Sequence, residues 1–424
     1  MDALLVKDYI SEYLRRETPV LVPREIKLKL RKGKALSIIG PRRAGKTSFM
    51  WEVIPTYNRN ETIYMDFEDI ALRGLSATEV LRVVTEIFTE VSGKNAKNVF
   101  LDEIQNIDGW QSLVRTLLDR EYVVFVTGST SKLLAKEIAT QLRGRSVSVL
   151  LLPFSFTEFI RAKKSKNVEN YNFNDVGKVK NMLTEYLNFG GYPEVVFEQR
   201  EKGRLIQEYK ELIFFKDFVE RHEVKSIEVA RFIFSFVTQC FANEMSVRNV
   251  VNALRSNGIS FGSNTVYDYV DKLQDTMIFF FLDRFSAKVK LRTGWPKKVY
   301  LADNGLAWKL SEDRGRLMEN AVFLELKRRQ ALSPTSELYY YNNGSGGEVD
   351  FVVRSESRIE ELIQVTYASG KNDVKERELK SLIKASDELQ CKKLTIITWD
   401  YAEAIALKGK NILCKPMWQW LTDK

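Results

Sequence analysis

A glycine-rich loop between an apolar strand and a helix constrains the fold of this chain more than any other feature. Residues 40–47 read Gly-Pro-Arg-Arg-Ala-Gly-Lys-Thr and directly follow the apolar run 35–39. This spacing is typical of loops whose backbone N–H groups surround a phosphate at a helix N-terminus. A chance match is the alternative, but strand, loop and helix together favour a phosphate-binding loop.

Short apolar runs alternate with amphipathic segments through about the first 160 residues. The runs lie at 35–39, 62–65, 98–101 and 122–126 and are rich in β-branched residues. Such alternation is typical of a parallel sheet with helices on both faces. An α/β domain is therefore predicted for residues 1–180, in which the polar stretch 161–180 is a mobile insertion or linker.

Three further domains are predicted from changes of pattern. Residues 181–235 are helical, with a break at Gly190–Pro193, and are expected to form a lid. Residues 236–304 hold two helices across a tight turn and then two strands with a basic loop, which suggests a winged helix-turn-helix. Residues 305–424 form another α/β unit.

Two helical faces are predicted within these domains from apolar residues at helical spacing. The first comprises Leu205, Tyr209, Leu212 and Phe215. The second comprises Val266, Tyr269, Val270 and Leu273.

Composition limits the classes of function. A chain of 424 residues exceeds what one core usually supports. Three scattered cysteines and a single histidine favour a reduced setting and exclude a His-based metal site. No apolar run approaches the length of a membrane span, so a cytoplasmic protein without a membrane segment is expected. The net charge of +9 favours polyanionic partners, although a well-solvated surface explains it equally well.

The loop predicts ATP as ligand and Mg2+ as cofactor. Lys46 is expected to bridge the β- and γ-phosphates, and the Thr47 hydroxyl to bind the metal. The predicted nucleotide-binding residues are Gly40, Pro41, Arg42, Arg43, Ala44, Gly45, Lys46, Thr47 and Ser48.

An acidic pair follows the run 98–101, where a parallel sheet places its ligand contacts. Asp102 is predicted to hold the Mg2+, and Glu103 to orient the water that attacks the γ-phosphate. Taken alone, such a pair is more often a strand end that meets solvent. Its position after a phosphate-binding strand favours catalysis.

Three residues downstream complete the predicted catalytic set. Ser129 is chosen from the hydroxyls at 127–130 as a sensor of the γ-phosphate, with a helix-capping role as the alternative. Arg145, and Arg143 second, are candidates for an arginine supplied to a neighbouring subunit. A solvated or ion-paired arginine is the commoner outcome.

These motifs, in this order, resemble the archaeal and bacterial AAA+ ATPases that carry a C-terminal domain of unknown function. The similar segments are 40–47, 101–105, 126–130, 142–146, 152–159 and 190–193. The resemblance implies an ATPase acting as a homo-oligomer, with a hexamer among the options. It also makes Pro193 a nucleotide contact and matches Arg24 to an arginine before the phosphate-binding loop.

The C-terminal unit is similar to PD-(D/E)xK nuclease domains, which bind a divalent metal. The resemblance assigns the acids to Glu319, Glu348 and Asp350, but Gln364 and Thr366 stand where (D/E)-x-K is expected. The second carboxylate is thus an amide and the lysine is missing, unless Lys375 or Lys380 replaces it. A degenerate, nuclease-derived binding domain is favoured over a working nuclease.

The leading hypothesis is an oligomeric ATP-driven switch or motor acting on nucleic acid, with duplex DNA favoured. A signalling or scaffold ATPase with protein partners and an ATP-regulated endonuclease are the alternatives. The predicted nucleic-acid contacts are Tyr267, Lys272, Lys288, Lys290, Arg292 and Lys297.

Overall fold

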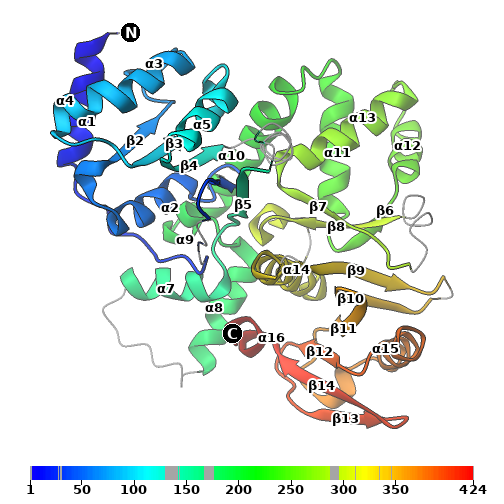
Figure 1. The fold of residues 1–424 in the computed structure, drawn as a ribbon. Coiled ribbons are helices and arrows are strands. Elements are labelled where there is room, and N and C mark those ends of the chain that lie inside the picture. The colour runs from blue at the N-terminus through cyan, green and yellow to red at the C-terminus, as the bar shows by residue number, and fades with distance from the viewer. Residues whose placement is uncertain are drawn as a thin grey trace. The chain divides into compact units, whose positions relative to one another are not determined.

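The computed structural model forms two compact units, 1–152 and 153–424 (Figure 1). No described helix is both long enough and apolar enough to cross a bilayer. The residues described are 2–26, 28, 31–128, 142, 144–166, 176–286, 296–310, 312–333, 335–344 and 346–423.

The first unit contains a five-stranded sheet in the order β2-β3-β4-β1-β5, and all of its pairings are parallel. Its strands are β1 (Ala35–Ile39), β2 (Thr62–Asp66), β3 (Asn98–Asp102), β4 (Val123–Gly128) and β5 (Ser146–Leu150). The first four confirm the predicted strands, whereas β5 was not predicted. Strands β1 and β3 are buried at every position, as expected for strands covered on both faces.

Helices and short helical turns connect these strands. They are α1 (Ala3–Arg15), α2 (Lys46–Val53), η1 (Ile54–Thr56), η2 (Arg59–Glu61), α3 (Ala77–Arg82), η3 (Val83–Ile87), α4 (Phe88–Ser92), η4 (Ile104–Asn106) and α5 (Trp110–Asp119). Phe100 and Phe125 stack between neighbouring strands with ring centroids 4.2 Å apart. This aromatic pair fixes β3 beside β4, and the acidic residues follow at the end of β3.

The second unit begins with helices: α7 (Phe156–Lys166), α8 (Val176–Phe189), α9 (Pro193–Phe197), α10 (Lys202–Leu212), η5 (Ile213–Glu220) and α11 (Ile227–Gln239). The predicted break at Gly190–Pro193 is confirmed. The linker prediction is wrong for 161–166 and 176–180, which are helical. Buried Phe159, Ala162 and Val179 anchor these turns despite the polar residues around them.

Of the first predicted helical face, Tyr209 is buried, Leu205 and Leu212 are half-buried, and Phe215 is exposed. Ile206, Tyr209, Ile213 and Phe214 are buried, whereas Phe215 is 39% exposed. The segment η5 is a π-helix. Within η5 the wider turn changes the spacing, which accounts for Phe214 rather than Phe215 being buried.

The two predicted helices and two strands of 236–304 are confirmed as elements. They are α12 (Val247–Ser256), α13 (Ser263–Leu273), β7 (Phe279–Leu282) and β8 (Lys297–Leu301), with β6 (Asn243–Met245) and η6 (Gln274–Thr276) in addition. The strands form an antiparallel sheet in the order β6-β8-β7. The second predicted helical face is buried throughout. The winged-helix assignment itself stays a prediction.

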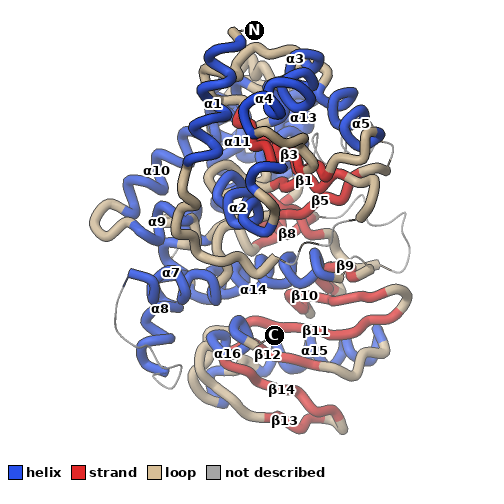
Figure 2. The backbone as a smooth tube through the Cα atoms, turned by 60° about the vertical axis from the view of Figure 1, so that its left-hand side comes forward, coloured by secondary structure: helices blue, strands red, loops and turns tan. Residues whose placement is uncertain are grey.

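The C-terminal part is a mixed six-stranded sheet, whose strands follow the order β13-β14-β12-β11-β10-β9 (Figure 2). Only β11–β12 and β12–β14 pair in parallel among the described strands of this sheet. Its elements are η8 (Asn304–Ala307), α14 (Arg314–Leu332), β9 (Ser336–Asn342), β10 (Glu348–Ser355), β11 (Arg358–Val365), η9 (Lys371–Asp373), α15 (Glu376–Leu389), β12 (Leu394–Thr398), β13 (Ala404–Leu407), β14 (Lys410–Pro416) and α16 (Met417–Thr422).

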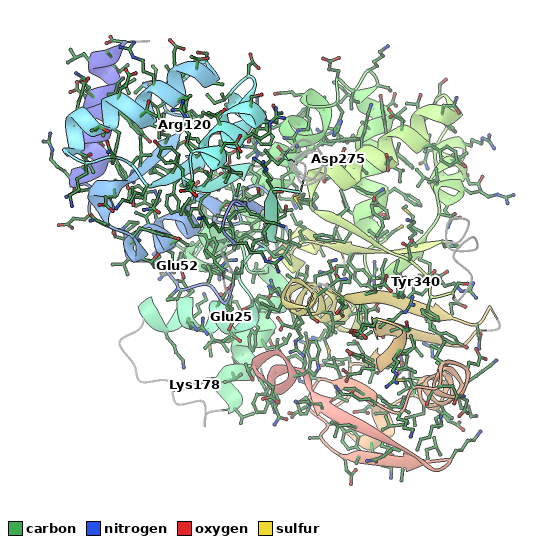
Figure 3. The ribbon with its side chains drawn as sticks, viewed as in Figure 1. Glu25, Glu52, Arg120, Lys178, Asp275 and Tyr340 are labelled. Atoms are coloured by element: carbon green, nitrogen blue, oxygen red, sulfur yellow. The ribbon has the colours of Figure 1, made fainter. Side chains whose placement is uncertain are left out.

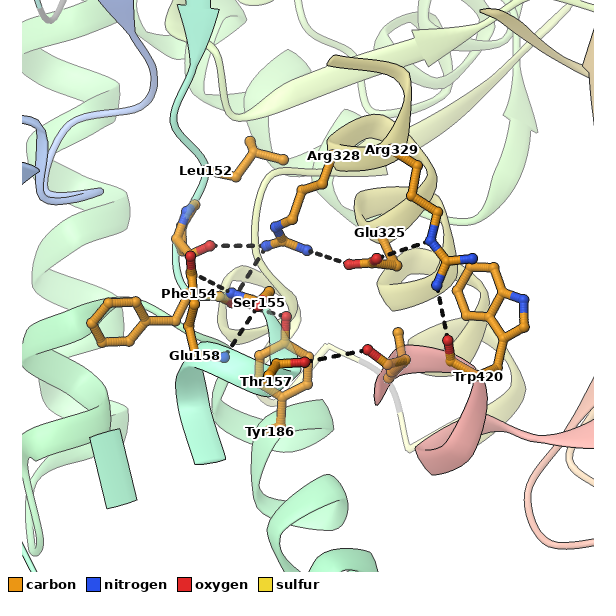
Figure 4. Close-up of polar contacts among 12 residues, drawn as sticks. Leu152, Phe154, Ser155, Thr157, Glu158, Tyr186, Glu325, Arg328, Arg329 and Trp420 are labelled. Carbon is orange, nitrogen blue, oxygen red and sulfur yellow. Dashed lines mark hydrogen bonds and ion pairs between the residues drawn. The ribbon is translucent and has the colours of Figure 1, made fainter. Parts of the chain in front are cut away.

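An arginine of α14 fastens the first residues of the second unit (Figure 4). Arg328 donates to the carbonyl oxygens of Pro153 at 2.8 Å and Phe154 at 3.3 Å. The Tyr186 hydroxyl donates to the Phe154 carbonyl at 3.0 Å, and the Phe154 N–H donates to the Gly191 carbonyl at 2.8 Å. Two segments that resemble the AAA+ family, 152–159 and 190–193, therefore pack together.

A buried carboxylate holds the turn between α8 and α9. Asp303 is 2% exposed and accepts hydrogen bonds from the N–H groups of Gly191 at 2.6 Å and Gly305 at 2.8 Å. Gly190 has a φ of +77°, and a Cβ there would lie 1.6 Å from Asp303 Oδ1. The turn therefore requires glycine at 190 for both backbone conformation and space.

The Asp303 carboxyl predicts a pH dependence of stability. Burial raises its pKa to about 7, although the two N–H groups act to lower it. In the unfolded chain the pKa returns to about 3.9, so the folded state binds the extra proton between these values. Its contribution is therefore present at low pH and is lost as pH rises towards 7, by up to roughly 1.4 kcal/mol per pH unit.

Asp303→Asn should accordingly make the fall in unfolding free energy between pH 5 and pH 7 shallower, measured by urea denaturation. Asp108→Asn is the control, since Asp108 is exposed on a turn. An Asp303→Asn profile as steep as that of the wild type would contradict the assignment.

Candidate functional site

The loop 40–47 is closed by its own lysine. The Lys46 ammonium is buried and donates to the carbonyl oxygens of Gly40 at 3.2 Å and Pro41 at 3.1 Å. Gly45 adopts a left-handed φ of +93°, and a Cβ on Gly40 would lie 2.1 Å from the Leu151 carbonyl oxygen. Both glycines are thus required by geometry, and the helix α2 begins at Lys46.

Arg24 braces this loop from outside. Its guanidinium donates to the Ala44 carbonyl at 3.2 Å and to the carbonyl of Leu152, beyond the end of β5. Its backbone N–H donates to the carboxylate of Glu52, which is labelled in Figure 3. The arginine that the resemblance singled out therefore connects the loop, α2 and the residues after β5.

Asp102 lies at the end of β3 inside a cage of hydroxyl groups. The side chain is 1% exposed and accepts a hydrogen bond from the Tyr64 hydroxyl at 2.9 Å and another from Thr127. The Thr47 hydroxyl lies near this carboxylate and acts to lower its pKa. Burial raises the pKa of Asp102, and the hydroxyls of Thr127 and Thr47 partly offset that rise. The two predicted metal ligands, Thr47 and Asp102, therefore lie near each other.

Glu103 follows in a left-handed conformation with φ of +51°, which is uncommon for a residue with a side chain. Its N–H donates to Thr127 Oγ1 at 3.0 Å, and the Gln105 amide donates to its carboxylate. Thr127 thus contacts both members of the acidic pair. The neighbouring strand β4 orients Asp102 and Glu103.

Sequence reasoning missed three residues of this site. Tyr64 and Thr127 bind Asp102, and Asp66 pairs with Asp102 in strand register. Burial, together with the charges of Asp102 and Glu103, raises the pKa of Asp66 to about 6. The signal was available, because all of them lie near the carboxyl ends of adjacent parallel strands.

The residues present fit a divalent cation. A threonine hydroxyl and a carboxylate lie near each other, and oxygen atoms of this kind are the ligands that Mg2+ prefers. Asp66 and Glu103 add negative charge beside Asp102. A cation at this position would offset carboxylates that are otherwise costly to bury together.

The remaining predicted catalytic and nucleotide-binding residues differ in their surroundings. Arg145 forms an exposed ion pair with Asp119, whereas Ser129 and Arg143 lie outside the described residues. Pro193 is the first residue of α9 in the second unit. Ser48 is exposed in the first turn of α2, and Arg43 has a φ of +63° within the loop.

The predicted nucleic-acid contacts divide into three groups. Tyr267 is 58% exposed on α13. Lys272 pairs with Asp268 at 2.7 Å, and Lys297 pairs with Asp283 at 2.9 Å. Lys288, Lys290 and Arg292 lie outside the described residues.

The residues predicted to form a degenerate nuclease site converge around a lysine that was not predicted. Lys298 of β8 contacts Glu319 at 2.8 Å, Glu348 at 2.6 Å and Asp350 at 2.9 Å. The Gln364 amide donates to Asp350 at 2.8 Å. Lys375 and Lys380, the sequence candidates for the missing lysine, instead face Glu378 and Glu376.

Comparison with known proteins places the chain in a family. Residues 32–160 match a family model described as an AAA domain, while 180–316 and 314–418 match domains of unknown function, DUF8612 and DUF4143. The uncharacterized protein MJ1544 of Methanocaldococcus jannaschii is 35% identical over 410 residues, which cover 94% of this chain and 91% of that protein. The chain belongs to the family of that protein.

A second protein is similar over most of the chain. An uncharacterized protein of Haemophilus influenzae is 26% identical over 394 residues, 90% of this chain and 93% of that protein. Among solved structures, AMPPCP-bound DnaA from Aquifex aeolicus is 13% identical and covers 64% of this chain and 86% of its own, with a TM-score of 0.27. Likeness at that level carries no argument about the ligands of the present chain.

Thr127 provides a test of the hydroxyl cage. Thr127→Val removes the donor to Asp102 and the acceptor for the Glu103 N–H without a change of shape. Because a buried carboxylate then loses a hydrogen bond, we expect a loss of about 1–3 kcal/mol in urea unfolding. The control Thr116→Val removes an exposed hydroxyl and should cost less than about 0.5 kcal/mol. Equal losses in both variants would contradict the role of the cage.

Proposed function

We propose that this protein binds and hydrolyses ATP with Mg2+ in its first unit. The observation that carries the proposal is the position of the buried Asp102, which ends strand β3 of the same sheet as β1 and whose pKa, raised by burial, the Thr47 hydroxyl of the phosphate-binding loop acts to lower. The AAA-domain match over the same residues supports it. A loop of this kind without an acidic partner would support only phosphate binding.

The roles follow from the positions of the groups. Lys46 would exchange the Gly40 and Pro41 carbonyls for phosphate oxygens, so its ammonium stays solvated by oxygen throughout. Thr47 and Asp102 would hold Mg2+, which neutralises charge that develops on the phosphates. Glu103 would orient the attacking water, because its backbone is already held by Thr127.

Action on a larger partner is the second part of the proposal. The chain would work as an oligomeric switch or motor, in which Arg145 or Arg143 reaches the ATP of a neighbouring subunit. Pro193 would contact the nucleotide from the lid, and Ser129 would sense the γ-phosphate. The Arg145–Asp119 ion pair is exposed, so its guanidinium can be released at little cost.

Two substitutions separate binding from hydrolysis. Lys46→Ala removes a charged hydrogen-bond donor worth about 1.5–3 kcal/mol and should weaken ATP binding roughly 10- to 100-fold in calorimetry. Glu103→Gln should retain ATP but lose turnover by roughly 100-fold or more in a phosphate-release assay. Lys94→Ala, which removes an exposed lysine, is the control. Wild-type turnover in Glu103→Gln would show that the acidic pair is misassigned.

The choice between nucleic acid and protein partners depends on the winged-helix region. Its second helix, α13, carries Asp268 and Asp271 beside Lys272, so its surface alone attracts phosphates poorly. Contacts with duplex DNA would therefore come mainly from the basic residues of 288–297, with Tyr267 exposed for stacking. A signalling or scaffold ATPase with protein partners is the alternative that the acidic helix favours.

Filter binding to duplex DNA across a salt series distinguishes the two partners. On the nucleic-acid hypothesis, affinity falls steeply with salt. Replacing Lys288, Lys290 and Arg292 by alanine then reduces the slope by about 0.9 for each phosphate that is no longer neutralised. Lys94→Ala should leave the slope unchanged. Absent or salt-independent binding would exclude the nucleic-acid hypothesis and leave the protein partner.

A further inference from the structure

The second unit contains a buried ionic cluster that joins two sheets. Lys298 lies on β8 of the three-stranded sheet, while Asp350 and Glu348 lie on β10 of the six-stranded sheet. Glu319 reaches the same point from α14, and the Tyr300 hydroxyl donates to its carboxylate at 2.7 Å. The resemblance to metal nucleases leads one to expect a divalent cation at this place.

We propose that the Lys298 ammonium is the permanent cation of this cluster, so that the carboxylates form a closed ionic joint between the two sheets and bind no divalent metal. The acids that the nuclease resemblance singles out then form a structural contact in place of a metal site. This inference is independent of the ATPase proposed above.

The geometry of the ammonium supports the proposal first. An ammonium group has three N–H donors, and Lys298 meets carboxylate oxygens of three different residues at 2.6 to 2.9 Å. Mg2+ requires oxygen ligands at about 2.0–2.1 Å. A metal bound to these same oxygens would overlap the ammonium, so the two cations exclude each other.

The Lys298 side chain is buried, and its strand is paired on both sides. The side chain is 3% exposed, and β8 is the central strand of its sheet. Residue 298 pairs with Glu244 of β6 on one side and with Leu282 of β7 on the other. Displacement by a metal would therefore strand a charged ammonium in the interior, which is strongly unfavourable.

Gln364, which stands where the nuclease motif has a carboxylate, favours a lysine ammonium over a divalent metal at this cluster. Gln364 donates its amide N–H to Asp350 Oδ2, which also accepts from the Val365 N–H at 2.9 Å. A carboxylate at 364 would instead add a further negative charge beside Asp350. One ammonium cannot neutralise so many acids, so the amide fits a cluster with a single positive charge.

The negative charge of the carboxylates that the single ammonium does not neutralise is stabilised in two other ways. The Glu348 side chain is 41% exposed and is solvated at the edge of the cluster. Burial raises the pKa of Glu319 to about 7, so this carboxyl can keep its own proton near neutrality. Among the described residues, no group of three or more His, Cys, Asp or Glu side chains is arranged to hold a metal ion. A second cation is therefore unnecessary.

Removal of the ammonium should recreate a metal site. Two buried side-chain oxygens near this cluster, Gln364 Oε1 and Glu378 Oε2, are among the described oxygens without a hydrogen-bond partner. Burial raises the pKa of Glu378, and the charge of Asp350 adds to that rise, so the Glu378 carboxyl lies near this cluster. With Lys298 absent, these oxygens and Asp350 would be available to a divalent ion.

The experiment measures Mn2+ binding to the full-length, nucleotide-free protein by electron paramagnetic resonance. Wild type and Asp350→Asn should bind the same amount of Mn2+, because the cluster takes none. Lys298→Met, which keeps the length of the side chain without its charge, should gain one equivalent. That equivalent should be lost in the double variant Lys298→Met/Asp350→Asn.

Two outcomes would overturn the proposal. The first is Mn2+ bound by the wild type and lost in Asp350→Asn, with or without metal-dependent DNA cleavage. The second is a folded Lys298→Met variant that gains no Mn2+, since something other than the ammonium would then exclude the metal. If Lys298→Met fails to fold, the comparison of wild type with Asp350→Asn still decides between a closed joint and a metal site.

Discussion

Helix α14 positions several elements of the second unit, because the middle of the helix is largely buried. Its apolar residues from Leu317 to Leu326 pack into the core, and Asn320 is buried with them. Asn320 exchanges hydrogen bonds with the backbone of Leu301, and Glu319 meets Lys298. Arg329 donates to the Trp420 carbonyl in α16. A polar group that is buried must be paired, so these pairings fix where each neighbouring element lies.

Each unit buries an aspartate on a strand, and the two carboxylates are stabilised by different kinds of group. Asp102 and Asp350 both lie on strands and are almost completely buried. The described contacts of Asp102 come from hydroxyl groups, which stabilise a carboxylate without cancelling its charge. Asp350 contacts an ammonium, which does cancel it. The negative charge of Asp102 is therefore not neutralised by these hydroxyl groups and favours a bound cation. The charge of Asp350 is neutralised by a side chain of the same protein.

The sequence predicted the elements near the phosphate-binding loop well, because strand periodicity and the loop motif are local signals. Strands β1 to β4 and the proximity of Thr47 to Asp102 follow from them. The buried face of η5 could not be predicted, since a π-helix has no clear sequence signature and changes the spacing. Lys298 was missed because its partner Asp350 is 52 residues away and only the tertiary fold joins them. Local motifs predict local sites, whereas an ion cluster between sheets depends on the whole fold.

The ionic joint bears on how fragments of this protein behave. A fragment beginning near residue 305 would keep Glu319, Glu348 and Asp350 but would lose the strand that carries Lys298. Its acids would then repel one another, and any divalent ion in the buffer would relieve that repulsion. Metal binding or DNA cleavage by such a fragment would therefore result from the loss of Lys298 and would not be a property of the intact protein.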